Sequence, residues 1–451
     1  MKKKDQVTAA EEQKEAVQVK GKKRRAREAQ REIRWDRLDN TAHLFPVIAG
    51  ESMSNVYRIS VTLTELVDRE LLQQALDMVL PGFDTFNVCM QKGIFWYYFE
   101  TNNKPAPKVV KEHDFPCRYI EPYSNNNYLF RITYYRKRIN LEVFHVLADG
   151  MGGINFLREV TYQYLRLKYP EIAAVKKNRL SEHTSLNTED SYVKNYKKGH
   201  AKGYETKRAI EVKGEKLSRG ELGVMHGYMS VKQVKQAAKK YDTSINEYFV
   251  IIFMYSVYVE YLKRMRSDKP IVCAVPVNLR PFFDSMTTRN FFVMVSAVFK
   301  PEKDEYSFEE IADIVKKSLR GQITKEHLED LFSYNVSNQK NILLRSIPFF
   351  IKKIAMKLVY LSSAKANTST VTNIGNIKID EEYSPFIKSF HAMISISTGQ
   401  NIKGAICSYN DTMVFTFTSI LRDTAIQRGF FRKLVEDGVD ISIESNGVYY
   451  D

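Results

Sequence analysis

The chain of 451 residues is too long for a single ordinary hydrophobic core and suits two domains of roughly 200 residues each plus an extension. Its composition is 44% hydrophobic, 27% charged and 12% aromatic, which is typical of a globular protein and excludes disorder over most of the length. The net charge of +15 favours an anionic partner, with nucleic acid, an anionic membrane surface and a phosphorylated small molecule as the candidates.

The start of the chain is a basic extension. Residues 1–34 contain twelve lysines and arginines against six acidic residues, and they show no periodic apolar face. A segment of this composition cannot bury a core, so we expect a flexible, solvated tail, with contact to nucleic acid or a membrane as the alternatives. The tail also lacks the apolar stretch of a signal peptide, which predicts a cytoplasmic protein.

No pattern in the sequence predicts a disulfide framework, a zinc site or a membrane span. The cysteines lie far apart, without CxxC or Cys/His spacing, at Cys89, Cys117, Cys273 and Cys407. The longest apolar run, at 248–262, is shorter than a bilayer span and contains Glu260, so it predicts a buried helix. We therefore expect no bound metal or prosthetic group and no transmembrane segment.

Hydrophobic periodicity predicts a first lobe at 35–180. Its expected elements are, in order, a docking segment at 35–48, a strand at 56–63, a helix at 68–80 capped by Asp68, strands at 86–90 and 94–99, a hairpin of 128–135 with 139–145, and a helix at 153–170. The stretch at 181–220 is polar, basic and poor in aliphatic residues, which favours a crossover linker between lobes.

A second lobe is predicted at 221–451. It begins near Gly223, and its expected elements are a strand and then a helix within 227–241, the helix capped by Ser230, a helix at 246–265, strands at 270–277 and 291–299, helices within 307–361, a meander of strands at 390–398, 403–409 and 412–420, and a last helix at 424–437. Because both lobes mix strands with helices, the sequence predicts an α/β protein.

One stretch combines several chemically useful residues. FHVLADGMGG, at 144–153, follows the predicted hairpin and places His145 at the end of a strand. An imidazole in that position has a pKa near neutrality, which suits proton transfer at physiological pH. The alternative is a core histidine followed by a tight turn that uses Gly150, Gly152 and Gly153.

The stretch resembles the HHxxxDG signature of the condensation-domain and chloramphenicol-acetyltransferase-like superfamily. WDRLDNTAHLFP, LEVFHVLADGMGGINFL, VPVNLRPFF with TTRNFF, and VTNIGNI together are similar to its bacterial alcohol acetyltransferase branch, near wax-ester synthases and polyketide-associated acyltransferases. The resemblance runs from about residue 35 to the C-terminus. It implies two chloramphenicol-acetyltransferase-like lobes, each a mixed sheet with helices, that enclose a central tunnel with the histidine midway.

The resemblance implies a role for each residue of the signature. His145 matches the second, catalytic histidine and would be the general base that removes a proton from an acceptor hydroxyl, or from an amine, as the acceptor attacks a thioester. No covalent acyl-enzyme is then needed. Asp149 would have a structural role, turned away from the tunnel and paired with Arg280, and Gly150 would let the loop approach the tunnel wall closely.

The second lobe supplies further polar candidates. Thr372 and Asn373 in VTNIGN are candidates for holding the oxyanion or lining the tunnel, and the alternative for both is a loop of turn-forming residues. Asn278 and Asn290, which flank the other second-lobe motif, are expected to brace loops and to take no part in the chemistry.

The implied activity is transfer of an acetyl or other short-chain acyl group from acyl-CoA, the co-substrate, to an alcohol. Phe144 departs from the signature, because it replaces the first histidine of the doublet. Two alternatives stay open. One is amide or ester condensation from an acyl carrier protein, and the other is a catalytically inactive binding protein, which Phe144 favours. No specific nucleic-acid partner is expected.

Overall fold

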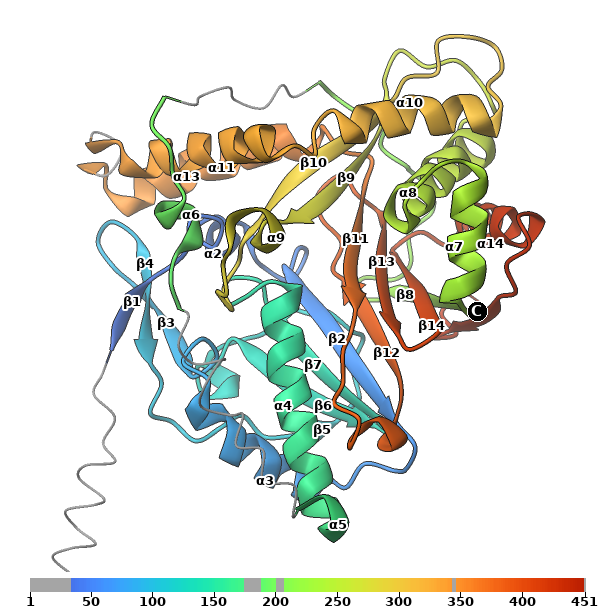
Figure 1. The fold of residues 1–451 in the computed structure, drawn as a ribbon. Helices are drawn as coiled ribbons and strands as arrows, with labels where there is room; N and C mark the ends of the chain where they lie inside the picture. Colours follow the sequence, from blue (N-terminus) through green and yellow to red (C-terminus); the bar gives the residue numbers. More distant parts are fainter. Residues whose placement is uncertain (1–33, 174–187, 200–206, 343–345, 450–451) are drawn as a thin grey trace, which may run out of the picture.

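The computed structural model describes residues 34–173, 188–199, 207–342 and 346–449, and their strands form three sheets (Figure 1). Two of the sheets are large and mix parallel with antiparallel pairs, and each is covered by helices. The mixed α/β architecture with two lobes that the sequence predicts is confirmed. The predicted tail and much of the predicted linker lie outside the described residues.

The N-terminal half is built on a sheet in the strand order β12-β2-β7-β6-β5. Its strands are β2 (Val56–Leu63), β5 (Val110–Lys111), β6 (Phe130–Tyr135), β7 (Arg138–Phe144) and β12 (Ile387–Ile394). Helices α3 (Arg69–Val79) and α4 (Gly150–Lys168) pack together on one face of it, and the short α5 (Pro170–Ala173) follows α4 (Figure 1).

Capping side chains fix where α3 and α4 begin. The carboxylate of Asp68 accepts hydrogen bonds from the backbone N–H groups of Glu70 and Leu71 at 2.8 and 3.0 Å, so the predicted cap is confirmed. The carboxylate of Asp149 does the same for Met151 and Gly152, and α4 therefore begins at Gly150, three residues before the predicted start.

The C-terminal half is built on a sheet in the order β10-β9-β11-β13-β14-β8-β15. Its strands are β8 (Gly223–Ser230), β9 (Ile271–Asn278), β10 (Phe292–Phe299), β11 (Ser369–Asn376), β13 (Ile402–Tyr409), β14 (Thr412–Ser419) and β15 (Ser442–Ser445). The helices that cover one face of it are α7 (Val231–Lys240), α8 (Ile245–Ser256), α10 (Phe308–Arg320) and α14 (Ala425–Glu436). The apolar run at 248–262 is buried in this core, as predicted.

The predicted C-terminal meander is confirmed for β13 and β14, which pair antiparallel, but it is wrong for β12, which does not pair with β13. It pairs antiparallel with β2, with Ile387 opposite Leu63 and Ile394 opposite Tyr57, and so forms the edge of the sheet of the N-terminal half. Alternating apolar residues predict a strand but do not reveal its neighbour. The two halves are therefore joined by a shared strand as well as by chain connections.

Smaller elements complete the fold between and around the two large sheets. A three-stranded sheet is formed by β1 (Trp35–Arg37), β3 (Val88–Lys92) and β4 (Tyr97–Thr101). The remaining helices that bear on the site or the surface are α2 (Phe45–Ile48), α6 (Ser191–Lys194), α9 (Arg280–Phe283), α11 (Lys325–Lys340) and α13 (Phe349–Ala364). Of the residues described, no helix is long and apolar enough to pass through a bilayer.

Candidate active site

His145 follows β7 directly, at the point where that strand leaves its sheet. Its backbone N–H donates to the carbonyl oxygen of Asn55 at 2.9 Å, which holds the start of the loop against the segment before β2. Phe144 and Val146 on either side are buried, but His145 itself keeps part of its surface exposed. The side chain of His145 is therefore not completely enclosed by its neighbours.

Aromatic rings from both halves of the chain hold the imidazole. The ring of Phe45 in α2 stacks on it with centroids 4.7 Å apart, and Tyr57 in β2 meets it edge-on at 5.1 Å. The ring of Phe292 in β10 lies 5.5 Å away. Because β10 belongs to the seven-stranded sheet, the position of the imidazole depends on both lobes.

A buried amide determines which nitrogen of the imidazole carries the proton. The two hydrogens of the Asn290 side-chain amide go to Asp39 Oδ2 at 2.9 Å and to the carbonyl oxygen of His145 at 3.1 Å. The amide oxygen of Asn290 must then face His145 Nδ1, 2.9 Å away, so Nδ1 donates the hydrogen bond. The lone pair is left on Nε2, where a general base needs it.

The charge states at the site are set mainly by burial. Burial lowers the pKa of His145, and the charge of Lys403 lowers it further, whereas Asp149 opposes both effects. The imidazole is therefore neutral near pH 7. Burial raises the pKa of Asp39 to about 7, although the hydrogen bond from Asn290 acts in the opposite direction.

Asp149 and Arg280 form the ion pair that the resemblance implies. Arg280 Nη1 lies 2.8 Å from Asp149 Oδ2, and Nη2 lies 3.1 Å from Oδ1, so the pair is bidentate. The guanidinium also donates to the carbonyl oxygens of Thr287 and Arg289. Both side chains are largely buried. The pair joins the start of α4 to α9 and the loop after it.

The close approach expected of Gly150 belongs to two other glycines. A Cβ added at Gly150 would lie 3.6 Å from Ile374, which is an ordinary contact. At Gly152 it would lie 2.1 Å from the carbonyl oxygen of Thr288, and at Gly153 2.7 Å from the hydroxyl of Tyr57. The expectation for Gly150 is therefore wrong, since Gly152 and Gly153 are the positions where no side chain fits.

Of the two candidates in β11, only Thr372 keeps a free polar group. Its side chain is half-buried, and its hydroxyl makes no hydrogen bond within the described part of the chain. Asn373 is exposed, and its side-chain oxygen accepts from the backbone N–H of Gly375 at 2.8 Å, in a turn where Gly375 has φ +89°. The turn-forming alternative thus holds for Asn373.

Lys403 in β13 is a buried cation near the site that sequence reasoning missed. It is 6% exposed, its ammonium group donates to the hydroxyl of Ser397, and no carboxylate in the described ranges lies within ion-pair distance. Burial lowers its pKa to about 7. Lys403 shares a face of β13 with Ala405, and Ala405 pairs with Thr372, so the cation and the free hydroxyl lie on the same side of the sheet.

Asn290 and Asp39 were also missed, for different reasons. Asn278 does brace a loop, since its side-chain oxygen accepts from the backbone N–H of Arg280. Asn290, which was expected to do the same, donates to the backbone carbonyl oxygen of His145 and also contacts its ring, a contact that the sequence did not predict. No pattern in the sequence separates the two asparagines. Asp39 lies within the quoted WDRLDNTAHLFP stretch. This stretch was predicted to dock on a lobe, and a charged residue in a docking segment was the available signal that Asp39 is buried against a polar partner.

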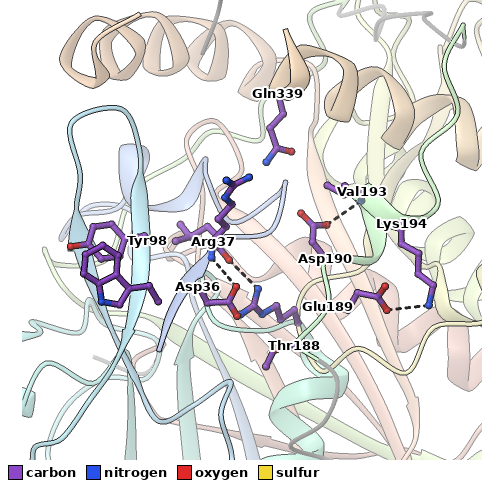
Figure 2. Close-up of a pocket in the computed structure, with 12 residues that line it drawn as sticks. Asp36, Arg37, Tyr98, Thr188, Glu189, Asp190, Val193, Lys194 and Gln339 are labelled. Carbon is purple, nitrogen blue, oxygen red and sulfur yellow. Dashed lines mark hydrogen bonds and ion pairs between the residues drawn. The ribbon is translucent and has the colours of Figure 1, made fainter. Parts of the chain in front are cut away.

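One pocket opens beside Arg37 and Asp190, and His145 is not among the residues that line it (Figure 2). It has a volume of about 780 Å³ and lies between β1, β4, α6 and α11. Its charged lining is balanced, three bases against three acids: Arg37, Lys194 and Arg289 with Asp36, Glu189 and Asp190. A balanced lining does not select an anion, so it does not favour the phosphates of CoA.

No cluster of metal-ligating side chains occurs in the described ranges.

Comparisons with known proteins identify structures that have a similar fold. No protein-family model matches the chain, and no curated protein matches it in sequence. Solved structures do match. TRI3 trichothecene 15-O-acetyltransferase from Fusarium sporotrichioides has a TM-score of 0.56 at 11% identity, over 89% of this chain and 94% of its own. TRI101 from F. graminearum, complexed with coenzyme A and T-2 mycotoxin, has a TM-score of 0.59 at 14% identity, over 90% and 99%.

A third similar structure is a condensation domain. The first condensation domain of the CDA synthetase has a TM-score of 0.53 at 12% identity, over 91% of this chain and 99% of that domain. The chain therefore has the two-lobed fold of condensation domains and chloramphenicol-acetyltransferase-like acyltransferases, over nearly the whole length of each. At these identities the likeness shows the fold alone.

Proposed function

We propose that the protein is an acyltransferase that moves an acetyl or other short-chain acyl group from a CoA thioester to an alcohol, as in the alcohol acetyltransferase branch. The observation that carries the proposal is the orientation of His145, with Nδ1 bound to Asn290 and Nε2 left without a hydrogen-bond partner in the described ranges. Two similar structures support it, since one is a 15-O-acetyltransferase and the other is a complex with coenzyme A.

In the proposed reaction, His145 Nε2 removes the proton from the acceptor hydroxyl as its oxygen attacks the thioester carbonyl carbon. The tetrahedral intermediate collapses, the carbon–sulfur bond breaks, and the imidazolium returns the proton to the departing thiolate. Asn290 accepts a hydrogen bond from Nδ1–H throughout, and Asp39 in turn accepts from Asn290, so the two stabilise the transient imidazolium. No acyl group is attached to the protein at any stage.

The negative charge on the thioester oxygen needs a donor or a cation placed beforehand. We assign this role to Lys403 together with the hydroxyl of Thr372, because both lie on the face of the sheet that points to the N-terminal half. Asn373 has no part in it, since its oxygen is held in the turn. Asp149 and Arg280 shape the loop, and Gly150 begins α4.

The two alternatives differ in what would support them. Condensation from an acyl carrier protein is kept as the second candidate, because a condensation domain is among the similar structures. The inactive binding protein rested on Phe144. That residue is 5% exposed and packs in the hydrophobic core of the N-terminal half, so a histidine in its place would be buried there and not beside Nε2.

The test is thiol release from a panel of acyl-CoAs and from the matching carrier-protein thioesters, with short, long and aromatic alcohols and an amine as acceptors. His145→Ala and the bulkier His145→Gln should each lower turnover by roughly 10² to 10⁴, the share ascribed to general acid–base catalysis, because neither side chain can shuttle the proton. Circular dichroism melts show whether both variants stay folded. Unchanged thiol release in a folded variant would remove His145 from the mechanism.

A further inference from the structure

Helix α13 carries a row of large apolar side chains on its solvent side. Phe350 is 66% exposed, Ile354 63% and Leu358 64%, and Ile351 is exposed as well. Residues at spacings of four share one face of a helix, so these side chains form a continuous outward stripe. The opposite face is packed, with Phe349 and Met356 against α2 and the β1-β4-β3 sheet. The helix is therefore apolar on both sides.

A second exposed apolar element adjoins the start of α13. The turn between β3 and β4 places Ile94 and Phe95 in solvent, with Ile94 79% exposed. Its backbone is tied to the helix, because the N–H of Phe349 donates to the carbonyl oxygen of Ile94 at 3.1 Å. The ammonium of Lys352 lies 4.0 Å from the ring centre of Trp96 in the same turn. We call the turn and the outward stripe of α13 together the α13 patch.

The charged residues of the segment that contains α13 are all basic. Residues 331–379 contain no aspartate or glutamate but seven lysines and arginines. Lys353 and Lys357, beside the apolar stripe, are exposed and have no acidic partner in the parts of the chain that the structure describes. Exposed Phe, Ile and Leu next to lysines are the composition of helices that lie in the headgroup region of an anionic bilayer.

We propose that the α13 patch docks the protein on an anionic membrane surface. The apolar stripe enters the boundary between headgroups and acyl chains, and Lys353 and Lys357 bind lipid phosphates. A second copy of the chain would fit the stripe less well, since the symmetric contact would bring equal positive charges together. The buried face of α13 packs on α2, and Phe45 of α2 stacks on His145, so docking also places the site close to the bilayer.

The test is flotation of the full chain with vesicles of phosphatidylcholine alone and with about one third phosphatidylglycerol. The parent should float with the anionic vesicles, and Ile354→Glu/Leu358→Glu should reduce the bound fraction at least about tenfold. Lys353→Glu/Lys357→Glu should reduce it by about fivefold per lysine and weaken its dependence on salt. All four side chains are exposed, so the variants should fold.

The matched control is Leu66→Glu/Met265→Glu, which adds the same charge at side chains 63% and 62% exposed in loops away from α13. It should float like the parent. Equal flotation of the α13 variants and the parent would overturn the proposal. So would a dimer in light scattering that Ile354→Glu/Leu358→Glu dissociates, with no vesicle binding. Thiol release with a short soluble alcohol should be the same in every variant, which separates docking from the proposed acyl transfer.

Discussion

His145 receives both its orientation and its tautomer from a residue that is distant in sequence. In the sequence Asn290 cannot be distinguished from other polar loop residues. In the structure its side-chain amide makes hydrogen bonds with Nδ1 and with the backbone carbonyl oxygen of His145. Asp39 accepts a hydrogen bond from the amide nitrogen of Asn290 and so determines the orientation of the amide group. In the proposed mechanism Asn290 is a positioning residue, and its removal should alter the titration of the histidine as well as the rate.

Replacing Asn290 tests this positioning role. In Asn290→Ala, Nδ1–H loses its acceptor, so the imidazolium is less stable, the pKa of His145 falls, and the acid limb of the kcat/KM profile moves to lower pH. Turnover should fall by roughly tenfold to a thousandfold, since both nitrogens then compete for the proton. Asn278→Ala, the same change at a loop-bracing asparagine, should leave the profile in place. A profile that did not move in Asn290→Ala would reduce the residue to a loop brace.

Burial of Lys403 lowers the stability of the folded protein, whereas its charge is proposed to raise turnover. Its folded pKa of about 7 lies below the ordinary value of 10.5, so the charged form is disfavoured by folding. The cost is absent above about pH 10.5, grows as the pH falls, and is complete below about pH 7. Lys403→Met should therefore stabilise the protein by roughly 2 to 5 kcal/mol at neutral pH, with a smaller gain at pH 10, in urea unfolding.

In the proposed reaction the thioester oxygen would lose its cation in Lys403→Met, so the same substitution should lower turnover. A stabilised protein with reduced thiol release is the expected combination. Ser397→Ala, which removes the hydroxyl that accepts from the ammonium, keeps the charge and should change turnover much less. A Lys403→Met variant that gained stability and kept full activity would leave the lysine without a catalytic role.

At the scale of elements, α4 depends on two glycines packed against backbone and ring. Gly152→Ala would place a methyl group 2.1 Å from the carbonyl oxygen of Thr288, and backbone cannot move aside cheaply. We expect a loss of roughly 2 to 4 kcal/mol in the free energy of unfolding. Gly150→Ala should be tolerated, since its methyl group meets Ile374 at an ordinary distance. Equal melting temperatures for the two variants would contradict this account of the loop.

Most elements could be predicted from the sequence, but their partners could not. The strand at 56–63 and the caps at Asp68 and Ser230 are where the sequence places them, because periodicity and capping are local properties. β12 was predicted as a strand and assigned to the wrong neighbour, because pairing depends on the whole molecule. The ion pair of Asp149 with Arg280 was predicted from the resemblance. Asn290 and Lys403 could not be predicted as site residues, because no sequence pattern distinguishes them from structural residues.

At the scale of the whole molecule, β12 makes the two halves depend on each other. The N-terminal sheet takes its edge strand from residues 387–394, including the buried Phe390 and Ala392. Residues 1–180 expressed alone should therefore aggregate or show no cooperative unfolding transition by circular dichroism. The same fragment with residues 386–396 attached through a glycine–serine linker should recover solubility. A soluble, cooperatively folded fragment 1–180 would show that β12 is dispensable.

The shared strand also has a consequence for synthesis on the ribosome. β7 is complete at residue 144, but the strand that covers the open side of β2 ends only at residue 394, about 250 codons later. At a translation rate of roughly 5 to 20 residues per second, the nascent chain carries an uncovered apolar edge for about 10 to 50 seconds. During that interval, chaperones can bind newly made chains most readily, and the uncovered edges of β2 in different chains can pair wrongly with one another.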